Sequence, residues 1–348
     1  MSKTYGVVLI GCGHIGQAHI EDIYFRDNIR IVGVVDVYEP NAKLFARKYG
    51  AECYTTDYHE MIQRDDVDIV IIATYARTHL AILKDCLAVG KHVLCEKPMT
   101  EASMEAAAEF YHAVKAAKTK VLIAHVLRHN DTYAKVRSMI REGAIGDVRF
   151  VRMVQNHHIM NPKRYAALLE DCPPVVDCGV HYIDVVRWFT GLEITSVGGL
   201  GTDIDGHNVG EFDHSLLTMK LSNGGSAYYE AGWANNLAAQ NLKEFIGNKG
   251  RIRITLGENR ANDAEEGDLI EYYTHEDGKY TTINNKSKYK NMWGQLQTLI
   301  EMIETGEDGN PSFEEAYDAF MIALIGNEAM KQNQVIELDY KWQEEYEK

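Results

Sequence analysis

The stretch that decides the fold is Val7-Val8-Leu9-Ile10-Gly11-Cys12-Gly13-His14-Ile15-Gly16. Its apolar start is typical of a buried strand, which runs into the pattern GxGxxG and then into a helical pattern. Gly11 allows a tight turn, Gly13 lets the backbone approach a pyrophosphate without a Cβ in the way, and Gly16 lets the helix pack closely against the strand. The phosphates of a dinucleotide would then meet the free N–H groups of the helix start. Because the chain has 28 glycines, the motif by itself also fits an ordinary strand-to-helix turn.

A second strand supports the dinucleotide interpretation. The apolar run Ile31-Val32-Gly33-Val34-Val35 ends at Asp36, about twenty residues after Gly16, where this fold places the acid that binds the adenosine ribose hydroxyls. A 2′-phosphate would be repelled by Asp36, and the following Val37-Tyr38 offers no arginine to bind one. The sequence therefore predicts NAD, with NADP disfavoured.

Composition sets limits on the class of protein. A chain of 348 residues exceeds the size of most single cores, which predicts two domains. The net charge of −15 argues against a nucleic-acid partner, because such binding depends on clustered lysines and arginines that the sequence does not show. No apolar run approaches the ~20 residues of a membrane span. The start of the chain shows no apolar region of a signal peptide, so we expect a cytoplasmic protein. The six cysteines form no CxxC pair, which predicts reduced thiols and no metal site.

Strands and helices alternate through the first third of the chain. This pattern predicts a doubly wound parallel sheet, an α/β Rossmann domain over residues 1–124. Thr100 is the expected cap of a long helix that runs to Ala117. The remaining expected elements are helices at 15–25, 39–49, 58–62 and 78–89, and strands at 67–74, 91–95 and 120–124.

The pattern changes after residue 124. Residues 147–155 alternate polar and apolar side chains, and two further strands, 215–221 and 226–233, flank an Asn-Gly turn. Residues 245–255 and 269–273 add more strands. We therefore expect residues 125–348 to form an α+β domain with a large, mostly antiparallel open sheet. The apolar helix expected at 313–330 is able to pack on either domain.

Lys97 lies where this fold places chemistry. It follows the strand at 91–95, and open α/β sheets bind ligands outside the carboxyl ends of their strands. Pro98 restricts the backbone of Lys97 to an extended conformation and so limits where its side chain points. The alternative is a solvated loop lysine.

A second candidate cluster lies at Asp177-Cys178-Gly179-Val180-His181-Tyr182-Ile183-Asp184. On a continuous helix Asp177, His181 and Asp184 share one face, and carboxylates beside an imidazole suit a proton-transfer histidine. The alternative is a capping aspartate with a histidine buried in the core. Zinc is disfavoured at His157-His158, because adjacent side chains of a strand point to opposite faces.

Together these motifs resemble one family. The GxGxxGxxH start (Gly11 to His19), Glu96-Lys97-Pro98 and DxGxHxxD (Asp177 to Asp184) are similar to those of the glucose-fructose oxidoreductase, inositol dehydrogenase and MocA family (Gfo/Idh/MocA). The resemblance covers nearly the whole chain, including His125-Val126-Leu127-Arg128 and the turn Gly247-Asn248-Lys249-Gly250.

The resemblance implies an NAD(P)-dependent dehydrogenase that acts on a secondary alcohol of a cyclitol or sugar. It implies that Lys97 orients the hydroxyl, that His181 removes its proton, that Asp177 binds substrate or steadies His181, and that Asp184 tunes His181. The implied cofactor-binding residues are Gly11, Gly13, His14, Ile15, Gly16, Asp36, Thr74, His79, Glu96 and Lys97. The implied substrate-binding residues are Lys97, His125, Arg128, His158, Asp177 and His181. One departure is Tyr75, where relatives often carry proline, so Tyr75 or Arg77 is free to contact ligands in its own way.

Two alternatives to a dehydrogenase remain open at this point. One is an NAD-dependent glycosidase that oxidises its sugar transiently, and the other is a nucleotide-sensing protein of the same fold without catalysis. The exposed face of the second-domain sheet, with Phe150, Tyr228 and Trp233 on its strands, predicts a homo-oligomer. The resemblance also implies a homodimer or homotetramer.

Overall fold

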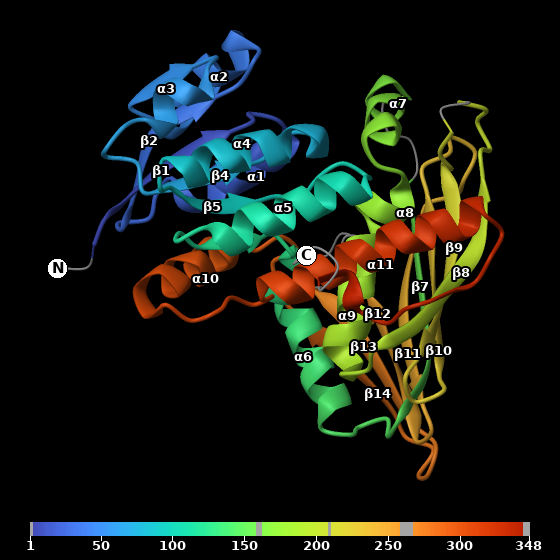
Figure 1. Ribbon diagram of the computed structural model, residues 1–348. Helices are drawn as coiled ribbons and strands as arrows, with labels where there is room; N and C mark the ends of the chain where they lie inside the picture. The colour runs from blue at the N-terminus through green and yellow to red at the C-terminus, as the bar shows by residue number, and fades with distance from the viewer. Residues whose placement is uncertain (1–2, 158–161, 208–209, 258–266, 344–348) are drawn as a thin grey trace. The chain divides into compact units, whose positions relative to one another are not determined.

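A computed structural model describes residues 3–157, 162–207, 210–257 and 267–343 (Figure 1). Its contacts divide into two compact units: Met1–His129 with Lys290–Tyr317, and Asn130–Tyr289 with Asp318–Lys348. The first unit thus continues to His129, past the expected boundary after residue 124, and also includes a segment from late in the chain. Among the described helices, none combines the length and apolarity that a membrane span requires.

The first unit is a doubly wound α/β structure, as predicted. Its sheet has the strand order β3-β2-β1-β4-β5-β6 with parallel pairing throughout. The strands are β1 (Tyr5–Ile10), β2 (Ile29–Val35), β3 (Cys53–Thr55), β4 (Ile69–Ile72), β5 (His92–Cys95) and β6 (Val121–Ile123). The helices are α1 (His14–Ile23), α2 (Glu39–Tyr49), α3 (Tyr58–Ile62), α4 (Ala76–Ala88), α5 (Met104–Ala116), the 3-10 turn η1 (Val126–His129) and α10 (Met292–Thr305).

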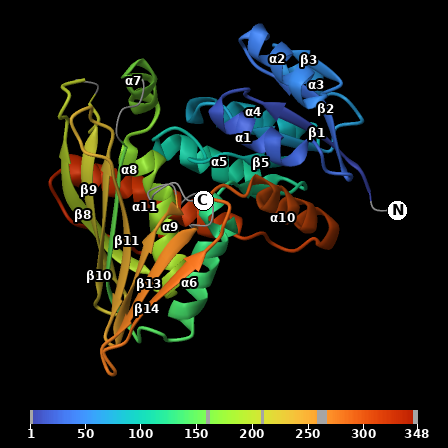
Figure 2. The ribbon, with the colours of Figure 1, turned by 180° about the vertical axis from the view of Figure 1, so that it is seen from behind.

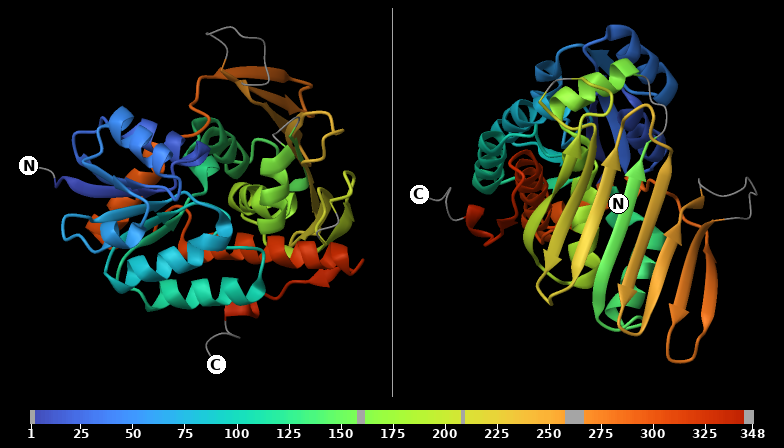
Figure 3. Two further views of the ribbon diagram at one scale, coloured as in Figure 1. Left: turned by 90° about the horizontal axis from the view of Figure 1, so that it is seen from above. Right: turned by 90° about the vertical axis from the view of Figure 1, so that its right-hand side faces the viewer.

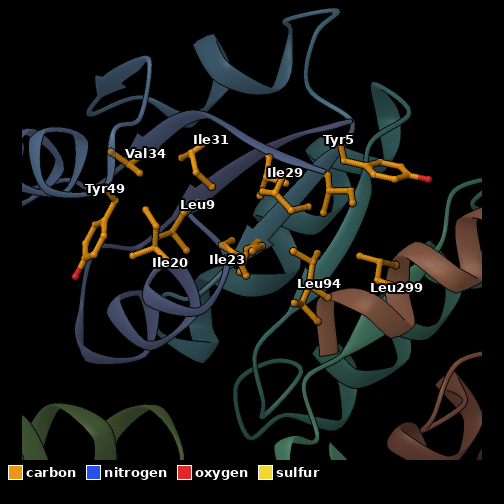
Figure 4. Close-up of a cluster of buried hydrophobic side chains, with 14 of the residues drawn as sticks. Tyr5, Leu9, Ile20, Ile23, Ile29, Ile31, Val34, Tyr49, Leu94 and Leu299 are labelled. Carbon is orange, nitrogen blue, oxygen red and sulfur yellow. The ribbon is translucent and has the colours of Figure 1, made fainter. Parts of the chain in front are cut away.

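Apolar strands and helix faces build the core of this unit. All four residues of β4 are buried, as expected for a parallel strand covered on both faces. Figure 4 shows Leu9 of β1 beside Ile20 and Ile23 of α1, and Leu299 of α10 near Leu94 of β5. Helix α10 therefore completes a core that the first third of the chain begins.

The start of α5 corrects one prediction. Ser103, not Thr100, is the N-cap, and its Oγ accepts the N–H of Ala106 at 3.2 Å. Thr100 is buried three residues earlier in the loop that follows Lys97. Asp57 is the N-cap of α3, and its side chain accepts the N–H of His59.

The second unit holds a nine-stranded sheet with the order β14-β13-β12-β11-β7-β10-β9-β8-β15. Its pairing is antiparallel except between β7 and β10, which confirms a mostly antiparallel sheet. The strands are β7 (Val148–Asn156), β8 (Ile194–Thr202), β9 (His214–Leu221), β10 (Ser226–Gly232), β11 (Gln240–Gly247), β12 (Gly250–Thr255), β13 (Asp268–Thr274), β14 (Tyr280–Asn285) and β15 (Ile336–Glu337). The helices are α6 (Asp131–Arg141), α7 (Pro162–Asp171), α8 (Pro174–Asp177), α9 (Gly179–Thr190), the 3-10 turn η3 (Lys341–Gln343) and the part of α11 (Phe313–Lys331) that follows Tyr317.

Helices cover one face of this sheet. In Figure 2, α6 and α9 lie against it. Aromatic rings of α9 stack on rings of the strands, Tyr182 on Tyr229 and Phe189 on Phe245. In the right-hand view of Figure 3 the opposite face of the sheet is in front of α6 and α9. Phe150 and Tyr228 lie half-buried on the strands with their ring centroids 6.0 Å apart. The expectation that Trp233 adds to an exposed apolar surface is wrong, because its side chain is only 6% exposed.

Candidate functional site

The glycine turn after β1 has the geometry that a pyrophosphate needs. Gly11 has a φ of +99°, and a Cβ there would lie 2.3 Å from the carbonyl oxygen of Ala73. A Cβ on Gly16 would lie 1.9 Å from the carbonyl oxygen of Gly11, whereas a Cβ on Gly13 would meet no atom within 4 Å. Gly13 is the N-cap of α1, so the space left by its missing Cβ lies at the start of the helix that holds His14 and Ile15. The residues present therefore fit the phosphates of a dinucleotide.

Asp36 is held next to this turn. Its Oδ2 accepts the N–H of Cys12 and its Oδ1 accepts the N–H of Tyr38, both at 2.8 Å. Burial, and then the charge of Asp36, raises the pKa of the Cys12 thiol to about 12, so this thiol is neutral and inert. The next residue, Val37, is 94% exposed. The carboxylate is thus fixed at the end of β2, as predicted for a ribose-binding acid.

His79 connects the loops that follow β4 and β5. Its Nδ1 lies 3.0 Å from the carbonyl oxygen of Pro98, and its Nε2 lies 3.2 Å from that of Thr74. Burial lowers the pKa of this histidine, so the neutral ring donates to only one of the two oxygens at a time. His79 is therefore buried between the loop that follows β4 and the loop that follows β5. Its contact with a cofactor stays a prediction.

Lys97 follows β5 and is half-buried, at the predicted carboxyl edge of the sheet. The neighbouring Glu96 is buried, and its Oε1 lies 2.8 Å from Nε2 of His19. Oε2 of Glu96 accepts the N–H of Lys97 at 3.2 Å. His19 and Glu96 therefore form a hydrogen-bonded chain that ends at the backbone of Lys97. The sequence motifs include all three residues, but they do not predict this chain of contacts.

Arg128 is engaged inside the first unit. Its side chain is 2% exposed, and Nη1 donates at 2.8 Å to both Oδ1 of Asn310 and Oε2 of Glu315. His125 is also buried, 2% exposed. Sequence patterns gave no sign of these partners because they lie more than 180 residues away. Substrate contacts of His125 and Arg128 stay predictions.

The loop between β4 and α4 carries a cation–π pair. The guanidinium of Arg77 lies 4.9 Å from the centroid of the Tyr75 ring, and both side chains are exposed. Thr74 and Thr78 share a hydrogen bond at 2.7 Å between their hydroxyls at the start of α4. This loop thus presents an aromatic and cationic surface.

In the second unit, Asp177 and His181 lie on consecutive helices rather than on one. α8 ends at Asp177 and α9 begins at Gly179, so the expected single helix is wrong. Cys178, between them, keeps helical angles (φ −90°, ψ −32°), and the N–H of His181 bonds its carbonyl oxygen at 3.1 Å. The break therefore changes the path of the backbone little. Asp184 is buried, 1% exposed.

Residues of the sheet that the sequence did not single out support this pair of helices. Tyr182 stacks on Tyr229 with centroids 4.6 Å apart, and the hydroxyl of Tyr229 bonds Oε1 of Gln155. Nζ of the fully buried Lys243 lies 5.2 Å from the centroid of the Tyr182 ring. Strand alternation was the available signal, because it places Tyr229 and Tyr228 on opposite faces.

The two units thus hold separate parts of the predicted site. The first brings the glycine turn, Asp36, Thr74, Glu96 and Lys97 to the carboxyl ends of its strands, which suits binding of a dinucleotide. The second holds Asp177 and His181, a carboxylate and an imidazole suited to proton transfer. The predicted substrate residue His158 lies outside the described residues.

A cluster of potential metal ligands lies elsewhere in the second unit. Ligand atoms of Asp205, His207 and Asp213 lie within 4.8 Å of one another. Asp213 accepts the N–H groups of Ile204 and Asp205, and Asp205 accepts two hydrogen bonds from Asn235. These carboxylates are used to hold the backbone of their loop. The cluster contains none of the predicted catalytic residues.

Comparison with known proteins agrees with this geometry. Residues 5–125 match the family described as the oxidoreductase family with an NAD-binding Rossmann fold, and residues 133–253 match the GFO/IDH/MocA C-terminal domain. The myo-inositol 2-dehydrogenase of Thermotoga maritima is 22% identical over 340 residues, which is 95% of this chain and 98% of that protein. The scyllo-inositol 2-dehydrogenase (NAD(+)) of Bacillus subtilis is 26% identical over 258 residues, 73% of this chain and 75% of that one.

A solved structure shares the fold. The scyllo-inositol dehydrogenase of Lactobacillus casei, with bound cofactor NAD(H) and scyllo-inositol, superposes with a TM-score of 0.76 at 24% identity. The alignment covers 96% of this chain and 99% of that one. The agreement therefore extends over both units.

Proposed function

Because the chain belongs to the Gfo/Idh/MocA family of NAD-binding oxidoreductases, we propose that it oxidises a secondary alcohol of a cyclitol with NAD. The observation that carries the proposal is the open glycine turn beside the fixed carboxylate of Asp36, which fits NAD. The names of the inositol dehydrogenases that match this chain favour a cyclitol over an aldose. A cyclitol is therefore the first candidate substrate, and a sugar is the second.

The chemistry separates into a hydride and a proton. When bound, NAD supplies the hydride acceptor. The ammonium of Lys97 donates a hydrogen bond to the reacting hydroxyl, which orients the carbinol carbon. The neutral imidazole of His181 takes the hydroxyl proton as the C–H bond breaks, and Asp177 binds substrate or steadies the ring. Substrate contacts from His125, Arg128 and His158 belong to the same proposal.

Assembly and location form a further part of the proposal. We propose a homodimer or homotetramer that pairs through the sheet face carrying Phe150 and Tyr228. The exposed Leu200 of β8 supports it, because the strand pairing puts Leu200 on the same face through Leu216 and Glu230. A light-scattering mass equal to one chain at micromolar concentration would contradict it. A cytoplasmic location, no nucleic-acid partner and no membrane partner stay predictions, the second supported by the net charge of −15.

A substrate panel tests the proposed function. Purified protein is incubated with NAD and, in turn, myo-inositol, scyllo-inositol, glucose, xylose or sorbitol, and NADH is followed by absorbance. We expect the highest kcat/KM with an inositol. Hydrolysis of a glycoside without accumulation of NADH would instead identify the glycosidase alternative. NAD binding without turnover of any substrate would identify the sensor alternative.

A further inference from the structure

Two buried side chains lie behind Lys97 within the first unit. The side chain of His19 on α1 is 0% exposed, and that of Glu96 after β5 is 10% exposed. Nε2 of His19 lies 2.8 Å from Oε1 of Glu96, and Oε2 of Glu96 accepts the N–H of Lys97. One carboxylate therefore ties helix α1 to the backbone of the lysine.

The hydrogen bonds define the protonation of this pair. Nδ1 of His19 is buried and has no hydrogen-bond partner among the described residues. A proton on Nδ1 would be an unsatisfied buried donor, so the geometry fits a neutral ring with its proton on Nε2, donated to an ionised Glu96. Burial opposes ionisation of Glu96, but its hydrogen bond and electrostatic interaction with His19, and then the charge of Lys97, bring the pKa of this carboxyl below its usual value.

We propose that His19 and Glu96 are a positioning pair for Lys97: His19 keeps Glu96 ionised, and Glu96 fixes the backbone and the ammonium charge of the lysine. This inference rests on the proposed role of Lys97 in the reaction. It gives Glu96 a different task from the cofactor contact that the family resemblance implies. It also explains why a carboxylate is buried where it contacts a histidine and a backbone N–H rather than water.

Two further titratable groups that interact with Glu96 do not share this charge. They are His79 from α4 and Cys95 on β5. Burial lowers the pKa of His79 and raises that of Cys95, so both are neutral near neutral pH. Glu96 and Lys97 are therefore the charged members of the group formed with His19, His79 and Cys95.

Kinetics of four variants test the pair. Glu96→Gln is expected to lower kcat roughly 10- to 100-fold while the Kd for NAD changes less than about threefold, because the lysine is misplaced but the phosphate turn is intact. The alkaline limb of kcat against pH, which reports loss of the Lys97 proton, is expected to move to lower pH. His19→Gln keeps an N–H near the position of Nε2 and should retain most turnover, whereas His19→Leu should resemble Glu96→Gln. Lys97→Ala should abolish the alkaline limb of the kcat profile, which would assign that limb to the Lys97 ammonium.

Asp22→Asn is the matched control. Asp22 is a buried carboxylate one turn along α1, and its Oδ2 accepts the N–H of Met292. This variant is expected to lose stability and to keep kcat and the pH profile. The proposal is overturned if Glu96→Gln keeps kcat within twofold, or if it weakens NAD binding as much as it lowers turnover.

An NMR measurement on the wild-type protein tests the pair without depending on enzymatic activity or on the folding of variants. Nitrogen-15 NMR of the histidine rings should show His19 with its proton on Nε2 and none on Nδ1 at pH 7. A proton on Nδ1 would overturn the pair. If no polyol reduces NAD, the proposed function fails, while this NMR result still decides the protonation of His19 and Glu96.

Discussion

Asp36 and Cys12 are joined by a hydrogen bond of 2.8 Å from the backbone N–H of the glycine turn to the carboxylate at the end of β2. This hydrogen bond fixes one carboxylate oxygen beside the proposed dinucleotide site, and the second oxygen accepts the N–H of Tyr38. Each oxygen keeps a lone pair for a ribose hydroxyl. The preference for NAD follows from this fixed charge.

NAD should therefore exceed NADP in kcat/KM by about 100-fold or more, since like charges at contact in a partly buried site cost on the order of a few kcal/mol. Asp36→Asn removes the negative charge with little change of shape. It should lower the ratio of kcat/KM with NAD to kcat/KM with NADP at least tenfold. Asp65→Asn, an exposed acid of the same unit, is the control and should leave the ratio unchanged. Equal efficiencies with the two cofactors in the wild type would refute this account.

His181→Ala should lower kcat by roughly 10²- to 10⁴-fold, the usual contribution of one positioned proton-transfer group. The Kd for NAD should stay nearly constant, because the glycine turn and Asp36 belong to the other unit. His275→Ala, an exposed histidine of the second unit, is the control for turnover. Retention of more than about a tenth of wild-type kcat would assign less than ~1.4 kcal/mol of the barrier to His181 and would point to another base.

His79→Ala should lower the free energy of unfolding by about 1–3 kcal/mol, because one of the carbonyl oxygens of Thr74 and Pro98 loses its donor and a cavity opens. Urea unfolding measures the change. The Kd for NAD should rise less than tenfold. A larger rise without loss of stability would show that His79 acts chiefly on the cofactor, as the family resemblance implies.

Acid should destabilise the protein through His129. Burial lowers the pKa of His129 to about 4, and the charge of Arg128 adds to the effect. Since the pKa in the unfolded chain is ~6.5, the unfolded state binds the proton first as the pH falls. The contribution of His129 to the free energy of unfolding is therefore fully present above about pH 6.5. It declines by at most about 1.4 kcal/mol per pH unit down to about pH 4. Burial lowers the pKa of His79 and His92 as well, so they act in the same direction.

Urea unfolding at pH 7.5, 6 and 5 measures this dependence. In His129→Gln the decline between pH 6.5 and 5 should be shallower than in the wild type. An identical slope in the two proteins would remove His129 from the explanation.

Local patterns account for what the sequence predicted. The glycine turn, Asp36 and the position of Lys97 depend on neighbours within a few residues of a strand end, and short-range periodicity reports these features. The engagement of Arg128 by Asn310 and Glu315 depends on the late segment that carries α10, which no local pattern connects to the first unit. The break after Asp177 was also missed, because Cys178 and Gly179 leave the helical spacing of the side chains intact.

The central claim is that hydride passes from a carbinol carbon of a cyclitol to NAD. The most direct measurement is incubation of the protein and NAD with inositol deuterated at its ring carbons, followed by mass spectrometry of the nucleotide. The account predicts NADH that carries one deuterium, together with a ring ketone of the inositol. NADH without deuterium, or no reduction of NAD by any inositol under conditions where NAD is bound, would contradict it.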